Sequence, residues 1–211
     1  MTTLLKDLQW RYAVKKFDSN KKLTTTQIDL LKNTFNLTPT SYGLQPIRLL
    51  VISNDTLKQQ LQVYAYNQIQ ISTCSHLLVL CSQTDFGAKD IDRFVALNIG
   101  AMPDKKNYYT TYGKTLKKRF AQKSQSDIQR WADDQSFIAL GNLIDVCASA
   151  HIDSCPMSGF DPEAFDTILG LKELNLTAVS LLPVGYRAHD DLHQFDPKIR
   201  RPLNEMIVEI T

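Results

Sequence analysis

Two short basic segments near the ends of the 211-residue chain carry the side chains best suited to bind an anion. The first segment contains Arg11, Ala13 and Lys15, and the second contains Lys198 and Arg200. The β-branched residues and prolines around them favour extended backbone, in which alternate side chains lie on one face. Together the two segments would neutralise one phosphate dianion, and the small Ala13 would leave room for it. The sequence therefore predicts a small-molecule anion site built from both ends of the chain.

Composition and charge argue against several other classes of protein. The chain is 43 % hydrophobic and 22 % charged with a net charge of +2, which is ordinary for a globular protein and gives no reason to expect nucleic-acid binding. No apolar stretch approaches the roughly 20 residues of a membrane span, and no signal peptide is visible. The four cysteines lack C-x-x-C spacing, which favours reduced and mostly buried thiols. We expect one cytoplasmic domain spanning residues 1–211, with no membrane partner.

The hydrophobic pattern predicts an alternation of helices and strands. A capping box at Thr24 marks the start of one helix. The second half of the longest predicted helix carries apolar residues on almost all of its sides. A helix without a clear polar face is expected to be buried on all sides. One interpretation is that this helix lies between two subunits. The expected helices cover residues 24–37, 55–65 and 126–150 and, with irregular helix, 88–122; the expected strands cover 47–53, 76–81, 177–186 and a further segment, 206–210.

The chain lacks the common nucleotide-binding motifs. No G-x-G-x-x-G follows a predicted strand and no Walker A motif is present, so a phosphate would be held by side-chain cations. His189 and His193, with Asp190 and Asp191 between them, have the types of metal ligands. They follow a strand in a polar connection, which favours a solvated loop, and we predict no metal site.

The sequence contains seven segments in a characteristic order, among them 11–18, 39–46, 156–161 and 197–200. In that order they resemble the FMN-dependent nitroreductase family, in particular its oxygen-insensitive NAD(P)H nitroreductase and dihydropteridine reductase branch. Each segment is weak alone, but seven in order over nearly the whole chain are specific. The resemblance implies an α+β fold with a central, mostly antiparallel sheet wrapped by helices. It also implies an intertwined homodimer with FMN at the subunit interface and a C-terminal segment that extends onto the partner. The matching segments are 11–18, 39–46, Asn67, 141–143, 156–161, 182–186 and 197–200.

The resemblance also assigns residues to parts of the cofactor. Arg11, Lys198 and Arg200 match the phosphate clamp, in agreement with the interpretation of the basic segments. The backbone at Tyr12 and Ala13 matches the stretch under the ribityl phosphate. The remaining matches are Lys15, Asn67 and Gln70 beside the pyrimidine ring, Met157, Ser158 and Gly159 at flavin N5 and O4, Pro39, Thr40, Ser41 and Gly43 from the other subunit, and Tyr42 and Phe120 in the substrate pocket.

Three of these positions depart from the usual residues of the branch. Ala13 stands where serine is usual, which removes a hydroxyl contact to the phosphate. Ser158 replaces a glutamate, which a backbone contact to N5 would tolerate. Gln70 replaces a lysine and so removes one cation near the flavin ring. None of the three removes the phosphate clamp.

The activity that the resemblance implies is NAD(P)H-dependent flavin oxidoreduction. Hydride passes from NADH or NADPH to FMN N5, and an electron-poor acceptor such as a nitroaromatic or a quinone then enters the same pocket, which predicts ping-pong kinetics. The flavin carries the chemistry, so no catalytic side chain is expected. Two alternatives stay open: a quinone or enal reductase with incidental nitroreductase activity, and an FMN-binding protein without significant turnover.

Overall fold

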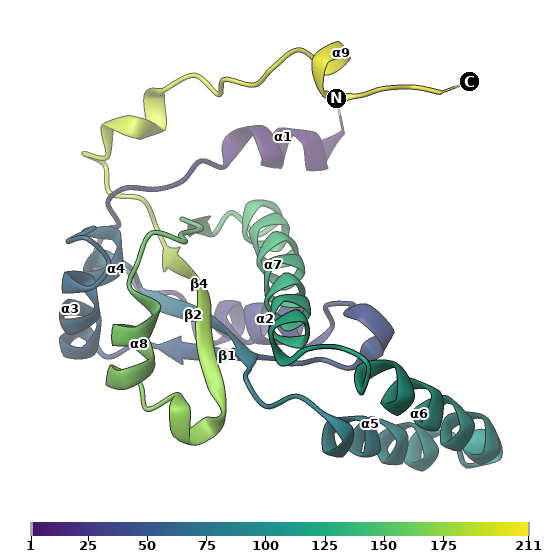
Figure 1. Cartoon of the computed structure of the whole chain (residues 1–211). Helices are drawn as coiled ribbons and strands as arrows, with labels where there is room; N and C mark the ends of the chain where they lie inside the picture. Colours follow the sequence, from purple (N-terminus) through teal and green to yellow (C-terminus); the bar gives the residue numbers. More distant parts are fainter. Residues whose placement is uncertain (1, 211) are drawn as a thin grey trace.

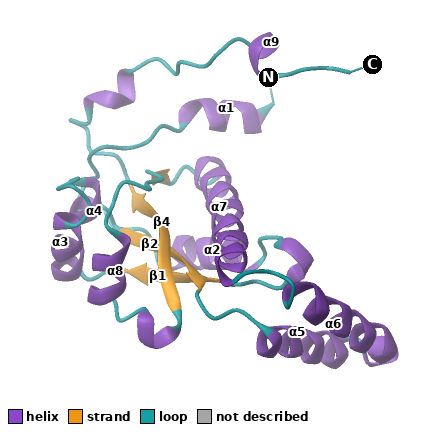
Figure 2. Ribbon diagram, viewed as in Figure 1, coloured by secondary structure: helices purple, strands orange, loops and turns teal. Residues whose placement is uncertain are grey.

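A four-stranded antiparallel sheet forms the centre of the computed structural model, which describes residues 2–210 (Figures 1 and 2). The strand order is β1-β2-β4-β3, and every neighbouring pair is antiparallel. The prediction of a central antiparallel sheet is therefore confirmed. In the described part of the chain, no helix is long and apolar enough to cross a membrane. The strands are β1 (Ile47–Ile52), β2 (His76–Gln83), β3 (Asp153–Ser154) and β4 (Leu176–Gly185).

Strand β2 reads as a continuous apolar run because helices cover both of its faces. Leu77 and Val79 pack into one hydrophobic cluster, whereas Leu78 and Leu80 pack into another. This alternation follows from the two-residue period of a strand. All five residues from Leu77 to Cys81 are at most 1 % exposed. A strand buried on both faces loses the polar alternation typical of a sheet edge.

Helices α3 (Asp55–Val63), α4 (Gln70–Thr73) and α8 (Pro162–Ile168) lie over one face of the sheet, and α2 (Thr25–Asn36) and α7 (Gln125–Ser149) over the other (Figure 1). The capping box that starts α2 is present. Thr24 accepts a hydrogen bond from Gln27 N at 3.3 Å, and the Gln27 side chain accepts one from Thr24 N at 3.0 Å. These bonds satisfy two of the N–H groups that a helix start leaves unpaired.

Residues 88–122 form two regular helices rather than the irregular helix predicted. Helices α5 (Ala88–Ala101) and α6 (Lys106–Phe120) pack side by side and project from the body of the molecule (Figure 1). One short 3₁₀ turn, beginning at Pro103, separates them. Proline lacks an N–H and is suited to the first turn of a new helix, so the chain reverses there. The sequence did not indicate two regular helices, because only a narrow stripe of residues on α5 and α6 is buried and the rest is polar or aromatic.

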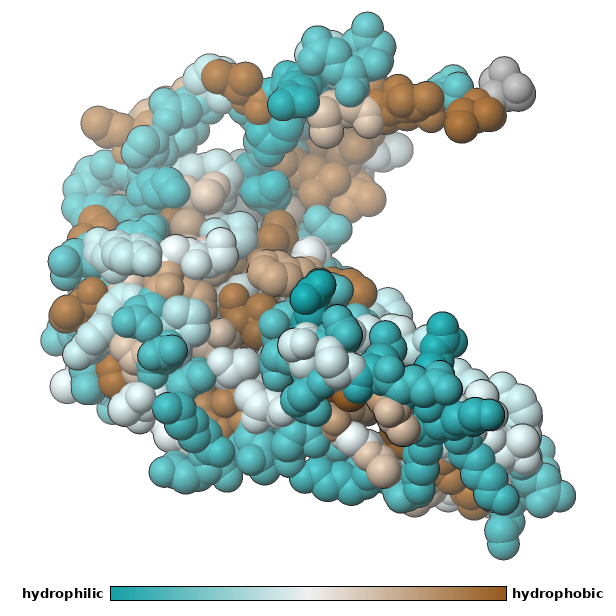
Figure 3. Space-filling view, in the orientation of Figure 1, coloured by the Kyte–Doolittle hydropathy of each residue, from teal (hydrophilic) through white to brown (hydrophobic). Residues whose placement is uncertain are grey.

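The C-terminal arm, residues 192–210, leaves the sheet and runs beside α1 (Thr3–Trp10) (Figure 1). It contains a 3₁₀ helix over Leu192–Phe195 and a short α-helix, α9 (Leu203–Met206), and the strand predicted over 206–210 is not formed in the described chain. Large apolar side chains along the arm are exposed, with Ile199 at 81 % and Val208 at 86 %. Figure 3 shows them as brown patches above an open side of the molecule. A single chain thus leaves the apolar surface of the arm uncovered.

Candidate functional site

The first basic segment is extended and is fixed by its inward-facing apolar residues. Ala13 forms a parallel bridge with Ser154, and Val14 N donates to Ser154 O at 3.3 Å. Val14 and Phe17 are 0 % and 2 % exposed, while Lys15 faces solvent. The segment therefore runs along the edge of the sheet beside β3, and Arg11 and Lys15 form no ion pair within residues 2–210.

The second basic segment meets the first through Lys198. Its Nζ donates to Leu8 O at 2.8 Å and also to Arg11 O. Burial lowers the pKa of Lys198, and the positive charges of Arg11 and Arg200 lower it further. The structure thus brings together the three cations that the sequence assigned to one clamp.

No carboxylate neutralises these cations within residues 2–210. Arg11, Lys198 and Arg200 form no ion pair with any Asp or Glu side chain described. Clustered cations repel each other, and a dianion between them would remove that cost. Guanidinium groups suit phosphate because their donors bind two oxygens at once. The clamp therefore fits a phosphate group.

A second group of predicted residues lies beside the first basic segment. The Gln68 side chain donates to Gly159 O at 2.9 Å and accepts from Gln70 Nε2 at 3.1 Å. Burial raises the pKa of Cys155, while the charge of Lys15 and a hydrogen bond with Gln70 act against that rise. The chain around residue 70 thus contacts both Gly159 and Cys155, and Lys15 is close to them.

The backbone at Asn67 is in the left-handed region, with φ of 56°, which asparagine tolerates better than most residues. Ser158 and Gly159 are exposed, and Asn67 is exposed as well, so these groups are open to a ligand. Met157 differs: it is 7 % exposed and pairs with Leu181 through its backbone. Its side chain is part of the core, so any ligand contact at this position is made by the backbone.

The loop predicted to contact the cofactor from the other subunit lies far from the clamp. Ser41 N donates to Gln135 Oε1 at 2.8 Å, which fixes the loop near the middle of α7. The ring of Trp10, at the end of α1, packs against the ring of His151, just past the C-terminal end of α7, with the ring centroids 4.6 Å apart. From Gln135 to Ser149 the helix extends roughly 21 Å at 1.5 Å per residue. One chain therefore does not bring Pro39, Thr40, Ser41 and Gly43 to its own clamp.

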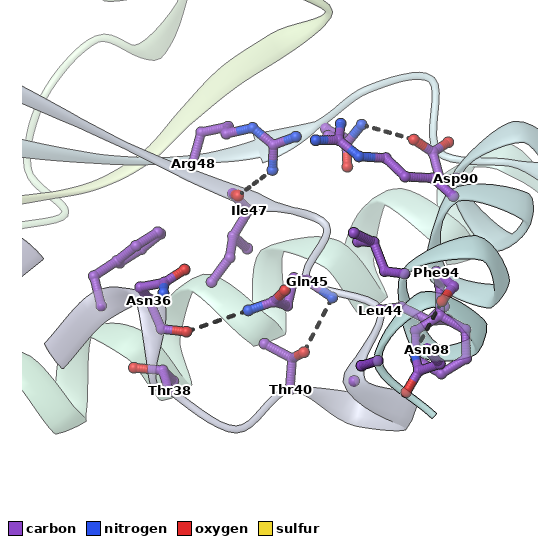
Figure 4. A pocket seen from close by; sticks show the side chains of 16 residues that line it. Asn36, Thr38, Thr40, Leu44, Gln45, Ile47, Arg48, Asp90, Phe94 and Asn98 are labelled. Carbon is purple, nitrogen blue, oxygen red and sulfur yellow. Dashed lines mark hydrogen bonds between the residues drawn. The ribbon is translucent and has the colours of Figure 1, made fainter. Parts of the chain in front are cut away.

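A pocket of about 520 Å³ lies against this loop, between α2, the start of β1 and α5 (Figure 4). Thr40, Gly43 and Gln45 contribute to its lining. The backbone N of Gln45 donates to Thr40 Oγ1, and its side-chain Nε2 donates to Asn36 O (Figure 4). Tyr42 and Gly43 both have positive φ, 59° and 70°, which turns the loop sharply and suits glycine at the second position.

Phe120 is not available for a substrate contact. It is 4 % exposed and packs on Phe86 and Trp131, with ring centroids 5.4 and 4.9 Å away. The substrate-pocket prediction for Phe120 is therefore wrong for this structure, because apolar packing has taken the ring into a core. Tyr42 is half-buried at the edge of the same cluster, 6.2 Å from the Phe120 ring, and remains a candidate.

Sequence reasoning missed Asp191, which it placed in a solvated loop. The Asp191 side chain is 3 % exposed and accepts hydrogen bonds from Tyr12 Oη and Lys15 N, each at 2.9 Å. Its neighbour Asp190 is exposed and pairs with Lys16. The only signal was the Asp-Asp doublet before the arm, and sequence alone does not say which carboxylate turns inward.

Comparison with known proteins agrees with this fold. The model of the nitroreductase family matches residues 8–186. The oxygen-insensitive NAD(P)H nitroreductase of Salmonella typhimurium is 29 % identical, over 95 % of this chain and 96 % of its own length. A nitroreductase-like protein from Streptococcus mutans superimposes with a TM-score of 0.85 at 22 % identity, covering 98 % of both chains. A protein of nitroreductase type from Exiguobacterium sibiricum 255-15, in complex with FMN, gives 0.82 at 18 % identity, covering 100 % of this chain and 98 % of its own.

The chain belongs to the nitroreductase family. The family prediction made from the seven segments is confirmed, and so is the nitroreductase-like fold.

Proposed function

We propose that this protein is an FMN-dependent NAD(P)H oxidoreductase that reduces nitroaromatic, quinone or related electron-poor acceptors. The observation that carries the proposal is the convergence of Arg11, Lys198 and Arg200, from opposite ends of the chain, without a carboxylate partner in the described residues. The names of relatives support it, since one is an NAD(P)H nitroreductase and another, of the same fold, was solved with FMN.

Different residues around the clamp bind different parts of the cofactor. Arg11 and Arg200 bind the phosphate, while Lys198 supplies a third charge and ties the arm to the backbone of the first segment. Lys15 places a cation beside the flavin ring, where it stabilises negative charge on the reduced ring. The backbone at Ser158 and Gly159 lines the flavin site, and the Gln68 side chain fixes it by donating a hydrogen bond to Gly159 O.

When bound, FMN supplies the redox chemistry by accepting a hydride from NADH or NADPH and passing reducing equivalents to the acceptor. The chain contributes binding and electrostatics, and no side chain of the site has the arrangement of a nucleophile with its base. One open site that serves nucleotide and acceptor in turn gives ping-pong kinetics.

We also propose that two copies of the chain complete each site. The loop at 39–43 contacts the middle of α7, whereas the clamp lies past the C-terminal end of that helix, so a second subunit would supply the loop. Phe137 and Ile138 on α7 are 48 % and 46 % exposed, which leaves an apolar face for that subunit. Strand β1 pairs only with β2 in the described chain, and its open edge suits the apolar end of a partner's arm.

The visible absorption spectrum of the purified protein, before and after anaerobic NADPH and NADH, tests this function. A yellow protein that bleaches with either nucleotide supports both the cofactor and the first half-reaction. Initial rates on a nitroarene, a quinone and an enal then separate nitroreductase from quinone or enal reductase. A yellow protein that neither nucleotide bleaches supports an FMN-binding protein without turnover. A colourless protein that does not take up FMN contradicts the proposal.

A further inference from the structure

Asp191 is a buried carboxylate at the root of the C-terminal arm. Its Oδ2 accepts from Tyr12 Oη and Lys15 N, both at 2.9 Å, and from Lys16 N at 3.3 Å. Its Oδ1 accepts from His193 N at 3.3 Å. Four hydrogen bonds thus join one side chain to the first basic segment and to the first turn of the arm.

This carboxylate keeps its charge without an ion pair. Within residues 2–210 no Lys or Arg nitrogen lies in ion-pair range of Asp191, although Lys16 pairs with the neighbouring Asp190 at 2.6 Å. Burial alone raises the pKa of Asp191, but the hydrogen bonds from Lys15 N, Tyr12 and Lys16 N outweigh it and lower the pKa below its usual range. A buried charge is costly unless it is fully hydrogen-bonded, so each of these donors contributes to keeping it there.

The Tyr12 side chain that reaches Asp191 is itself held in place. The Arg187 guanidinium lies over its ring, with Cζ 4.6 Å from the centroid, and over the Trp10 ring at 4.4 Å. Arg187 in turn pairs with Asp153 through Nη2 at 2.7 Å and donates to it through Nε at 2.9 Å. The Tyr12 hydroxyl is therefore presented to Asp191 by a braced ring rather than by a free one.

Asp191 and Lys198 connect the same two segments from opposite directions. The carboxylate of Asp191, at the base of the arm, accepts from the backbone of the first segment. Seven residues later, Lys198 on the arm donates to the backbone at Arg11. With both connections made, the stretch from 191 to 198 is closed against the segment that carries Arg11, and the relative positions of the three clamp cations are set.

We propose that Asp191 is a positioning residue for the phosphate clamp: it holds the two halves in register and so sets the preference for a phosphorylated flavin. This inference rests on the proposed flavin function. Oδ2 of Asp191 is occupied by Tyr12, Lys15 and Lys16 and Oδ1 by His193 N, so the carboxylate acts through those residues rather than on the ligand itself.

The test compares Asp191→Asn with Asp190→Asn, a matched change at the adjacent exposed carboxylate. Apoprotein of each variant is titrated with FMN and with riboflavin, which lacks the phosphate. We expect Asp191→Asn to weaken FMN binding by about tenfold or more, the usual effect of losing a charged hydrogen-bond acceptor, and riboflavin binding by clearly less, because riboflavin makes no use of the phosphate clamp. Asp190→Asn should leave the FMN-to-riboflavin affinity ratio at the wild-type value.

A loss of equal size for both ligands would assign Asp191 to general stability and overturn the positioning role, as would an unchanged FMN affinity. Tyr12→Phe removes one donor and keeps the ring, and we expect a smaller loss of the same ratio. This second variant keeps the inference testable if Asp191→Asn folds poorly.

Amide hydrogen exchange of the apoprotein separates this inference from the flavin function. We expect Asp191→Asn to raise exchange together in residues 12–16 and 192–200, and Asp190→Asn to raise neither. If wild-type protein binds no FMN, the proposed function fails, yet the exchange result still decides whether Asp191 joins the two segments. Faster exchange in only one segment, or in neither, contradicts the connection.

Discussion

Replacing Arg200 by alanine tests the phosphate clamp most directly. Arg200 lies on the exposed arm, and its charge contributes to the lowered pKa of Lys198. Its only hydrogen bond within the described chain runs from Nη1 to its neighbour Ile199 O. Its removal therefore breaks no contact between elements of the fold, and the effect on folding should be small.

The expected loss of FMN affinity in Arg200→Ala follows from the exposure of the Arg200 side chain. A hydrogen bond to a charged group contributes about 1.5–3 kcal/mol, and screening by solvent places an exposed guanidinium at the lower end. A loss of about 1.5 kcal/mol corresponds to a roughly tenfold weaker affinity for FMN. Arg11, which is half-buried, should show the larger loss when replaced, toward about 3 kcal/mol or roughly 150-fold.

The neighbouring Arg201 supplies the matched control. It is equally exposed, and its charge does not contribute to the pKa shift of Lys198. Fluorescence titration of apoprotein with FMN at fixed ionic strength should show weaker binding for Arg200→Ala and wild-type binding for Arg201→Ala. The apoprotein of Arg200→Ala should melt no lower than wild type, because the change also relieves repulsion among like charges.

Equal losses in the two variants would mean that only net charge matters, and the clamp as described would be wrong. A lower melting temperature of the Arg200→Ala apoprotein would assign the residue to the fold rather than to the ligand. The predicted combination, weaker binding without weaker folding, is typical of a residue kept for function.

Three further predictions concern the rest of the chain. Removing residues 203–210 should convert a dimer into monomers, as measured by light scattering, because the apolar arm no longer covers a partner. Gly113→Ala should destabilise the protein by about 1–2 kcal/mol in urea, since the new Cβ overlaps the Val95 side chain and outweighs a helix-propensity gain of about 1 kcal/mol, whereas Gly100→Ala, with nothing within 4 Å, should keep that gain. The pKa of Asp191 lies below its ordinary value of 3.8, so its stabilisation is present above that pH and disappears as the pH falls through the folded-state pKa. Asp191→Asn should therefore differ from wild type in melting temperature at about pH 7, and the difference should shrink as the pH falls below 3.8.

Sequence patterns were most informative where local chemistry decides the structure. The capping box at Thr24 and the apolar run at 77–81 each determine their element within a few residues, and both were predicted correctly. The basic segments were also readable, because cations at alternate positions of an extended backbone lie on one face and favour an anion there. Their meeting at Lys198 was predicted from their shared chemistry and agreed with the resemblance to a family, although no local pattern joins residues 190 apart in sequence.

Positions decided by tertiary packing were not readable from the sequence. In the sequence, a buried Phe120 looks the same as an aromatic residue that faces the substrate. Only the packing of Phe120, on α6, against Phe86 and Trp131 shows that it is buried. Asp190 and Asp191 are identical in type and adjacent, yet one is exposed and the other holds the first basic segment. The expected strand at 206–210 fails for a related reason, because within residues 2–210 this segment pairs with no other strand.

The separation of the half-sites along α7 links cofactor binding to assembly. A ligand that binds the dimer and not the monomer stabilises the dimer by about 2.7 kcal/mol for each site filled at a hundred times its dissociation constant. Two such sites would shift the monomer–dimer equilibrium by about four orders of magnitude. Exposed apolar residues on the arm, such as Ile199 and Val208, then need not hold the dimer together alone, because a flavin held by the clamp of one subunit and by the 39–43 loop of the other would add to that stability. A protein built in this way retains its flavin and its partner together, and weakening the clamp at Arg200 weakens both.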